Sequence, residues 1–216
     1  MTGGSFETVS WWTTHVTPRL VDVGSTSDDM LAYRRRVCAG LTGRVVELGF
    51  GGGANLEALP PEVTSIMAIE PSDVAWQLSQ KRRARSAVRV ERGGLDGQRL
   101  DLPDGNVDSV LSTLTLCTIP DAEAALHEVR RVLRPGGALH FFEHGLAPDT
   151  GVERWQHRLE PLQMRVFGGC HLTRRIDRLV EGSGLVIESI ERAYAPSPGI
   201  MRPWLFGYLG RAVRPA

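Results

Sequence analysis

Apolar residues follow two different spacings along the chain. Short apolar runs, bounded by glycine, proline or charged residues, predict β-strands at 44–48, 63–69, 88–92, 107–113, 138–143, 185–191 and 204–212. Between most of these runs, apolar residues recur at helical spacing, which predicts helices at 28–39, 53–58, 74–84, 121–133 and 174–182. Alternation of this kind is typical of an α/β domain built on a doubly wound sheet.

The segment between the fifth and sixth predicted strands departs from this alternation because it is longer than a plain crossover. Over residues 149–167 the apolar side chains approach helical spacing: Val152, Trp155, Leu159, Leu162 and Val166. We interpret this stripe as the core-facing side of a helix. The length of the segment also suits a lid or a pocket wall.

A glycine-rich turn follows the first predicted strand, in the stretch VVELGFGGGANLEAL that covers residues 45–59. Gly49, Gly51 and Gly53 fall at every second position and precede a predicted helix. Glycine tolerates positive φ and lets the backbone approach a ligand closely, and the free N–H groups of a helix start point at that place. The spacing differs from the G-x-G-x-x-G of dinucleotide binders, and glycine turns without a ligand are common.

Polar residues stand at the carboxyl ends of several predicted strands. Glu70 ends the second strand, where Pro71 stops it, and lies about 20 residues past the glycine turn, the position that holds a ribose in nucleotide-binding α/β folds. A solvated acid at a strand end is the alternative for Glu70. Asp96 can accept the exocyclic amine of an adenine, and the N–H of Gly97 can donate to a ring nitrogen. Ligands of open α/β sheets bind at this edge, to which we map Glu47, Gly49, Glu70, Asp96, Thr113 and Glu143.

Composition limits the function classes. Lysine plus arginine and aspartate plus glutamate are both 25 in 216 residues, so no long-range field attracts nucleic acid or an anionic membrane. We expect the basic runs 34–36 and 81–83 to be solvated helix faces. The three cysteines are far apart and odd in number, which favours a reducing, cytoplasmic setting. Because no Cys/His cluster has zinc spacing, we expect no metal. We expect no membrane span and no signal peptide.

Four motifs in order carry a family resemblance: VVELGFGGG, AIEP, LDGQRLDLPDGNVDSVLSTLTL and HEVRRVLRPGGALHFFEH. Over about residues 43–144 the chain resembles a class I S-adenosylmethionine-dependent methyltransferase. This resemblance implies an α/β fold with a Rossmann-like, doubly wound, seven-stranded sheet, mostly parallel with an antiparallel last strand. It also implies S-adenosyl-L-methionine as cofactor, bound by Glu47, Gly49, Phe50, Gly51, Gly53, Asn55, Glu70, Pro71, Asp96, Gly97, Thr113 and Leu114.

Within that pattern the neighbours of Gly49 would hold the methionyl part, Glu70 the ribose, and Thr113 and Leu114 the rim near the sulfonium. Two residues depart from it: Leu95 stands where many relatives have glycine, and Phe50 replaces a small or polar residue. We expect one methyltransferase domain over residues 1–216. Its parts are an N-terminal cap segment (1–42), a cofactor-binding core (43–144), a lid or substrate segment (145–184) and C-terminal strands (185–216).

A narrower resemblance covers nearly the whole chain. The stretches GGGANLEALPPEV, TLTLCTIPD, FFEH, RWQHRLEPLQMRVFGGCHLTR and MRPWLFGYLG are similar to the alkyl-thiol S-methyltransferases of the methyltransferase-like group. The expected acceptor is therefore a small molecule, a thiol or hydrogen sulfide. Alternatives are O-, N- or C-methylation of a lipid, quinone or secondary metabolite, and a non-catalytic adenosyl-binding module. The family's animal members carry an apolar N-terminal segment that is not found in this sequence.

Neutral charge and TLTL in place of an N/D-P-P-Y/F tetrad disfavour a nucleic-acid methyltransferase. A thiol acceptor must lose its proton, since the thiolate is the nucleophile. His144, at the end of the fifth predicted strand, is the first candidate base, and His171 is the second. Cys170 is expected to be buried rather than nucleophilic, and His140 is expected in the core. The sequence does not predict the oligomeric state.

Overall fold

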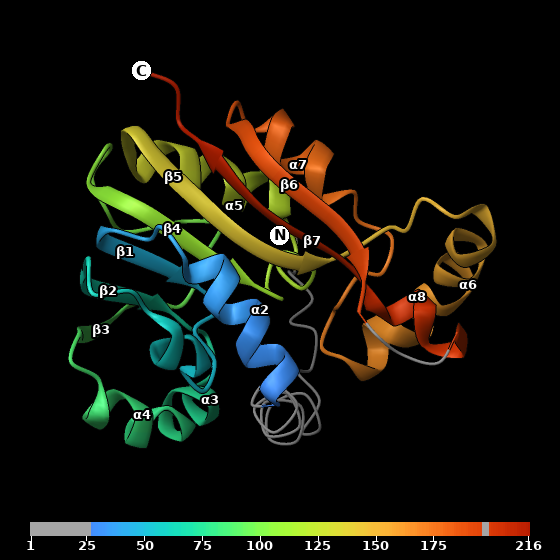
Figure 1. The fold of residues 1–216 in the computed structure, drawn as a ribbon, viewed down its shortest axis with the longest axis horizontal. Coiled ribbons are helices and arrows are strands. Elements are labelled where there is room, and N and C mark those ends of the chain that lie inside the picture. The colour runs from blue at the N-terminus through green and yellow to red at the C-terminus, as the bar shows by residue number, and fades with distance from the viewer. Residues whose placement is uncertain (1–26, 196–198) are drawn as a thin grey trace, which may run out of the picture.

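A seven-stranded sheet forms the centre of the protein (Figure 1). The structure is a computed structural model and describes residues 27–195 and 199–216. The strands are β1 (Gly43–Leu48), β2 (Val63–Ile69), β3 (Arg89–Gly94), β4 (Val107–Thr113), β5 (Leu133–His144), β6 (Val186–Tyr194) and β7 (Phe206–Val213). They lie in the order β3-β2-β1-β4-β5-β7-β6; β7 pairs antiparallel with both β5 and β6, and the other neighbouring pairs are parallel. This confirms the predicted doubly wound α/β sheet with its antiparallel last strand.

Helices cover both faces of this sheet. They are α2 (Asp28–Cys38), α3 (Asp73–Leu78), α4 (Gln80–Arg85), α5 (Ala122–Val132), α6 (Thr150–Val166), α7 (Ile176–Gly182) and α8 (Arg202–Leu205), with short 3₁₀ helices η2 (Ala54–Ala58) and η3 (Gly199–Met201). On one face α5 and α7 pack against the sheet, and on the other α2 crosses it (Figure 1). Residues 1–26 of the expected N-terminal cap segment lie outside the described residues.

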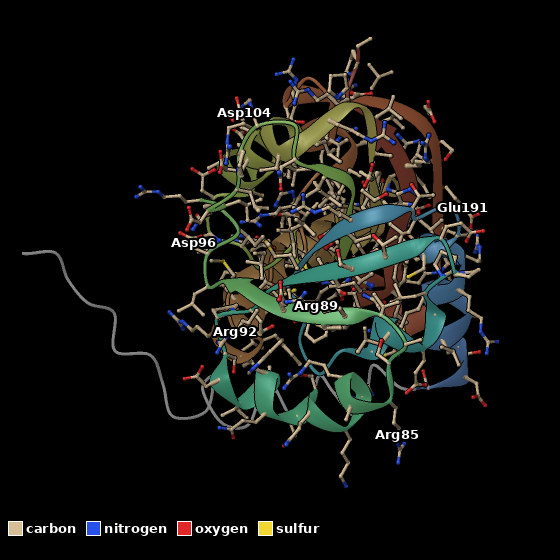
Figure 2. The ribbon with its side chains drawn as sticks, turned by 90° about the vertical axis from the view of Figure 1, so that its left-hand side faces the viewer. Arg85, Arg89, Arg92, Asp96, Asp104 and Glu191 are labelled. Carbon is tan, nitrogen blue, oxygen red and sulfur yellow. The ribbon has the colours of Figure 1, made fainter. Side chains whose placement is uncertain are left out.

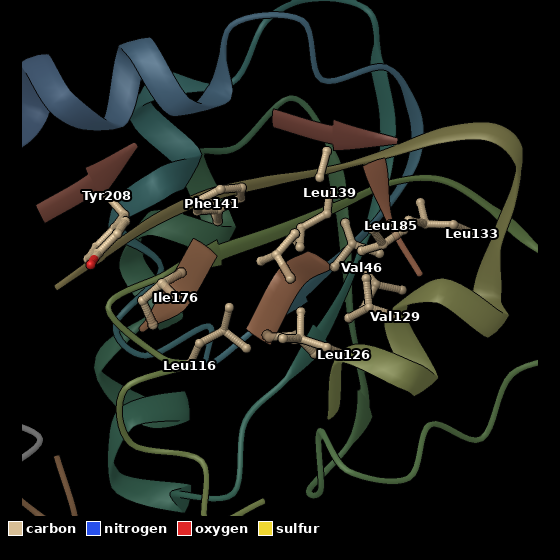
Figure 3. Packing of buried hydrophobic residues seen from close by; sticks show 14 of the residues in the cluster. Val46, Leu116, Leu126, Val129, Leu133, Leu139, Phe141, Ile176, Leu185 and Tyr208 are labelled. Carbon is tan, nitrogen blue, oxygen red and sulfur yellow. The ribbon is translucent and has the colours of Figure 1, made fainter. Parts of the chain in front are cut away.

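The larger core cluster lies between β4, β5 and the helices α5 and α7 (Figure 3). Leu126 and Val129 of α5 contribute to it, and Phe141 of β5 is fully buried. A Cβ on Gly210 would lie 2.6 Å from Cζ of Phe141, so this glycine in β7 leaves room for the ring. Burial of each such side chain stabilises the fold by about 1.5–3 kcal/mol. His140 is 3% exposed, which confirms its expected place in the core.

Local capping explains where the helices begin and end. The side chain of Asp121 accepts a 2.9 Å hydrogen bond from the amide of Ala124 at the start of α5, and Ser72 caps α3 in the same way. The prediction of one helix over 74–84 was wrong, because the chain breaks at Ser79 into α3 and α4. Oγ of Ser79 donates to the carbonyl of Trp76 at 2.6 Å, a local bond that competes with continued helix.

The predicted helix over 149–167 is present as α6, but its buried face was predicted wrongly. Trp155 and Leu162 are 54% and 60% exposed, whereas Gln156 and Gln163 are buried. The Gln156 side chain accepts from the amide of Ala147 at 2.9 Å and donates to two backbone carbonyls. Oε1 of Gln163 accepts from Nε1 of Trp204 at 3.0 Å. Hydrogen bonds to groups packed against α6 therefore explain the glutamines on its inner face. In Figure 1, α6 and α8 extend beyond the end of the sheet.

The expected last strand 204–212 begins later than predicted, because α8 occupies residues 202–205 and β7 starts at Phe206. The expectation of a solvated basic run at 34–36 was wrong for Arg34, which is 6% exposed. No helix in the described part of the chain combines the length and the apolar character needed to cross a bilayer.

Candidate functional site

Three glycines shape the turn that follows β1. Gly49, Gly51 and Gly53 have φ angles of +64°, +57° and +76°. A Cβ on Gly49 would lie 2.2 Å from Oγ1 of Thr115, so both backbone angle and space require glycine there. The amide of Gly51 donates a 2.7 Å hydrogen bond to Oε2 of Glu70. The predicted strand, turn and helix start are present, and the turn is fixed to the end of β2.

Glu70 lies at the carboxyl end of β2, as predicted, with only 5% of its surface exposed. Its Oε1 accepts the amide of Ser72 at 2.7 Å, so each carboxylate oxygen holds one backbone N–H. Burial raises the pKa of Glu70, while these two bonds and the charge of Arg92 oppose the shift. Each oxygen keeps a further lone pair, which can accept a hydroxyl group of a ligand.

A buried polar network links β1, η2, β4 and α2 at the same edge. Nδ2 of Asn55 donates to Oε1 of Glu47 at 2.7 Å and to Oγ1 of Thr113 at 2.9 Å. Nη1 of Arg34 donates to Oδ1 of Asn55 at 2.6 Å. All four side chains are buried. The structure therefore joins three predicted site residues, Glu47, Asn55 and Thr113, in one network.

The second carboxylate oxygen of Glu47 has no hydrogen-bond partner among the described residues, although it is buried. Burial raises the pKa of Glu47 to about 7, against the opposing effects of the Asn55 hydrogen bond and the Arg34 charge. A buried oxygen of this kind costs free energy unless a donor reaches it. The atom is therefore suited to a donor group of a bound molecule, such as an ammonium.

Asp96 and Gly97 follow β3 in a loop at the same end of the sheet. Figure 2 shows Asp96 beyond the strand that carries Arg89 and Arg92. Asp96 is exposed, and its Oδ1 accepts the amide of Gln98 at 2.8 Å. A Cβ on Gly97 would lie 3.5 Å from the side chain of Leu48. The loop therefore lies against the carboxyl end of β1, next to the glycine turn.

The chain turns sharply after β4, and Glu143 holds this turn. Leu114 has a φ of +54°, a positive value found at no other non-glycine residue in the described ranges. Its amide donates to the carbonyl of Phe142 at 2.8 Å. Glu143 accepts Oγ of Ser112 at 2.7 Å and the amide of Thr115 at 3.0 Å. Strained backbone in such an over-determined setting is typical of functional sites.

Two cysteines and a histidine meet behind this turn. Sγ of Cys170 lies 3.4 Å from Sγ of Cys117 and 3.4 Å from Nε2 of His144. Contact with Cys117 and burial raise the pKa of the Cys170 thiol. Burial favours neutral His144, but its contacts with Cys170 outweigh this, and the pKa of His144 is raised. Cys170 is half-buried and in contact with the first candidate base, which the sequence did not predict.

His171, the second candidate base, is paired with a carboxylate. Its Nδ1 donates to Oε1 of Glu160 at 2.7 Å, and the amides of Leu172 and Thr173 donate to Oε2 of the same residue. The amide of His171 donates to the carbonyl of Cys117 at 2.8 Å. Both histidine candidates therefore lie beside the turn after β4.

Comparisons with known proteins place this arrangement in a family. Residues 46–141 match the family described as a methyltransferase domain. The human thiol S-methyltransferase TMT1A is 34% identical over 179 residues, covering 79% of this chain and 72% of the relative. A possible histamine N-methyltransferase from Thermotoga maritima has a TM-score of 0.63 at 21% identity, over 94% of this chain and 99% of that chain. The chain belongs to the class I S-adenosylmethionine-dependent methyltransferases. It is a methyltransferase that uses S-adenosylmethionine as cofactor.

Another human relative, the thiol S-methyltransferase TMT1B, is 33% identical over 73% of this chain and 66% of its own length. A chain in a solved complex between the Haloferax volcanii Trm112 methyltransferase activator and a putative methyltransferase has a TM-score of 0.70 at 16% identity, covering 93% of this chain and 96% of that chain. These solved structures support the fold of the methyltransferase.

The edge described above fits this cofactor chemically. S-adenosylmethionine has ribose hydroxyls, an ammonium and an adenine amine, which match the carboxylates of Glu70, Glu47 and Asp96. The side chain of Phe50 packs inward, with its ring centroid 5.7 Å from that of Trp76. Only the Phe50 backbone in the turn is therefore available to a ligand. Pro71 is exposed and ends β2.

Two residues that contact the candidate site residues were not predicted from the sequence, Arg34 and Glu160. Arg34 shares a helix face with Val37 and Cys38, three and four residues later, and all three are buried. Helical spacing was therefore a signal that Arg34 faces inward. Glu160 has no comparable signal, because its partners come from a loop more than ten residues further along the chain.

Proposed function

We propose that this methyltransferase methylates a small thiol or hydrogen sulfide. The observation that carries the proposal is its 34% identity, over 79% of the chain, with a human thiol S-methyltransferase. The grouping of Cys117, Cys170 and His144 supports the same acceptor, since sulfur and imidazole groups suit a polarizable, soft molecule. The bound cofactor supplies an electrophilic methyl group on its sulfonium.

The chain's own residues would bind and orient that cofactor. We propose that Glu70 accepts the ribose hydroxyls, that Oε2 of Glu47 accepts the methionyl ammonium, and that Asp96 with Gly97 holds the adenine. The glycine turn at 49–53 and the edge at 113–114 would line the remaining part. The network of Asn55 and Arg34 would keep Glu47 in place. Preorganised contacts of this kind align reacting groups.

A thiol acceptor also needs a group that takes its proton or stabilises the negative charge of the thiolate. His144 and His171 are the proposed groups, because both lie beside the turn after β4. His171 has the orientation of a paired base: its Nδ1 donates to Glu160, which leaves Nε2 as the acceptor in the neutral ring. Glu160 would then be a positioning residue rather than a catalytic one.

A second acceptor class has its own support. A fatty-acid O-methyltransferase from Mycolicibacterium smegmatis is 26% identical over 76% of this chain. The exposed apolar residues of α6 and the loop after it would suit an acyl chain: Trp155, Leu162, Met164, Val166 and Phe167. The thiol proposal is preferred because the relatives named for thiols have the higher identity.

Setting and partners follow from the same observations. We propose that the enzyme acts in the cytoplasm, because Cys117 and Cys170 are free thiols in contact and a reducing compartment preserves them. The equal numbers of acidic and basic residues support a small-molecule partner rather than nucleic acid.

A competition assay tests the acceptor. The protein is incubated with methyl-labelled S-adenosylmethionine and an equimolar mixture of an alkyl thiol, sulfide, a fatty acid and a primary amine, and mass spectrometry identifies the labelled products. We expect methyl thioether or methanethiol to dominate. The Glu70→Ala variant should lose this product, and the Glu62→Ala variant, which changes an exposed acid, should keep it. A labelled methyl ester or methylamine as main product would contradict the thiol proposal.

A further inference from the structure

Cys117, His144 and Cys170 form a compact triangle of metal-binding atoms. Two of its edges, Cys170 Sγ to Cys117 Sγ and Cys170 Sγ to His144 Nε2, are each 3.4 Å. All three ligand atoms lie within 4.8 Å of one another. Thiolate sulfur and imidazole nitrogen are the ligands that Zn²⁺ prefers in proteins. The chemistry of the triangle is therefore that of a zinc site.

The dimensions of the triangle also match tetrahedral coordination. With Zn–S bonds of about 2.3 Å and Zn–N bonds of about 2.0–2.1 Å, a tetrahedron places two sulfurs about 3.8 Å apart and a sulfur and nitrogen about 3.5 Å apart. The observed 3.4 Å edges are close to both values. A disulfide would need the sulfurs at about 2.05 Å. The side chains are therefore spaced for an ion between them.

The backbone around the triangle is already fixed. The carbonyl of Cys117 accepts the amide of His171 at 2.8 Å, which ties together the two segments that carry the cysteines. Arg174 donates to the carbonyls of Leu116 and Pro120. The amide of Cys117 donates to Oε2 of Glu143 at 3.4 Å. A rigid frame of this kind reduces the cost of assembling a metal site.

A His144 whose Nε2 binds a metal cannot also act as the base for the thiol, so in this arrangement only His171 keeps that role. Nε2 of His144 faces sulfur, and its buried Nδ1 has no hydrogen-bond partner among the described residues. Zinc-binding and catalytic histidines are both commonly oriented by a hydrogen bond from the second nitrogen, often to a carboxylate. In this structure that arrangement is found at His171 and Glu160.

We propose that Cys117, Cys170 and His144 bind Zn²⁺ and leave a fourth coordination position for an acceptor thiol. Three protein ligands with one open position are the pattern of catalytic zinc sites, and both cysteine thiols would lose their protons on binding. A thiol entering the fourth position would likewise lose its proton to solvent and be held as zinc thiolate. The metal site stands on geometry alone, whereas the thiol in the fourth position rests on the proposed function.

Cobalt substitution tests the metal site. The reduced full chain, freed of metal, is titrated with Co²⁺ under anaerobic conditions with a phosphine reductant, and the thiolate-to-cobalt charge-transfer absorption is recorded. We expect saturation at an equimolar ratio, and competition by Zn²⁺. The variants Cys117→Ser, Cys170→Ser and His144→Gln should each weaken binding by roughly tenfold or more.

Matched controls separate the site from general effects of cysteine and histidine. Cys38→Ser changes a buried cysteine outside the triangle, and His127→Gln changes an exposed histidine; both should bind Co²⁺ as the unchanged chain does. Circular dichroism reports whether each variant is folded. Absence of the charge-transfer band in the folded, reduced chain, or an unchanged band in all three triangle variants, would overturn the metal site.

A second titration tests the fourth position. Adding an alkyl thiol to the cobalt-loaded chain should shift the ligand-field bands, whereas an alcohol of the same size should not. Unchanged bands at saturating thiol would overturn the open position while leaving the metal site intact. A shifted spectrum without any labelled thioether in the competition assay would instead contradict the proposed function alone.

Discussion

Nδ2 of Asn55 donates a 2.7 Å hydrogen bond to Oε1 of Glu47, and this bond is the main polar contact of a carboxylate that lies at the end of a buried strand. The same interaction opposes, but does not cancel, the effect of burial on the Glu47 pKa, which is raised to about 7. The carboxylate is therefore held at a cost in the cofactor-free protein, and the cost depends on pH.

Replacing Glu47 by glutamine should make the cofactor-free protein more stable at neutral pH. Because the folded pKa is raised, the unfolded chain ionises first as pH rises from about 4.5 to about 7, and wild-type stability falls over this window. The advantage of Glu47→Gln should grow by up to about 3 kcal/mol across it. Urea unfolding at the two ends of the window measures this. The exposed-site control Glu62→Gln should show a flat difference, and a flat difference for Glu47→Gln would contradict the raised pKa.

Removing the Glu70 carboxylate should weaken cofactor binding. Hydrogen bonds to a charged acceptor contribute about 1.5–3 kcal/mol each, so Glu70→Ala should raise the Kd for S-adenosylhomocysteine by about tenfold or more. The variant also frees the amide of Gly51, so circular dichroism should accompany the calorimetry. Glu62→Ala is the matched control with an unchanged Kd. Equal affinities of Glu70→Ala and the wild type would exclude Glu70 from the cofactor site.

Alanine at Gly49 should destabilise the turn more than alanine at another positive-φ glycine. Both Gly49 and Gly136 have positive φ, which costs a non-glycine residue about 1–2 kcal/mol. Around Gly136 no atom lies within 4 Å of an added Cβ, whereas at Gly49 it would meet Thr115. In thermal unfolding Gly49→Ala should therefore have a lower Tm than Gly136→Ala. The second change Thr115→Ala should recover part of this loss; equal losses for both glycines would rule out the contact.

On α6, losing a buried polar side chain should cost more stability than losing an exposed apolar one. Gln156→Leu would leave the amide of Ala147 and the carbonyls of Gly145 and Pro203 without their side-chain partner, at a cost of about 2–4 kcal/mol. Trp155→Gln, on the exposed face, should change stability by no more than about 0.5 kcal/mol. Denaturant unfolding of both variants decides the matter, and a larger loss for Trp155→Gln would mean that the apolar face is covered.

Sequence patterns predicted the interior of the sheet well, because strands buried on both faces are rich in Val, Ile and Leu. The bounds of β2 and β4 agree with the prediction, as does the positive φ of the glycine turn. The pattern misled where tertiary contacts overrule periodicity. On α6, Gln156 bonds to backbone groups of distant segments and Gln163 accepts from the indole N–H of Trp204, so the buried face is not the apolar one.

The group of Cys117, His144 and Cys170 was beyond the reach of the sequence. Cys117 lies 53 residues before Cys170, and His144 lies 26 residues before it, so no short ligand spacing marks the group. The strand order of the sheet and the 2.8 Å bond between His171 and Cys117 bring these segments together. The expectation of no metal rested on the spacing of Cys and His along the sequence. That spacing carries no information about side chains that the fold brings together from distant segments.

A crystal structure of the protein with S-adenosylhomocysteine is the most direct test of this account. It should show the ribose hydroxyls on the carboxylate of Glu70, the ammonium at Oε2 of Glu47, and the cofactor sulfur on the side of Cys117, His144 and Cys170. A nucleoside bound away from Glu70, or a sulfur turned away from the three side chains, would contradict it.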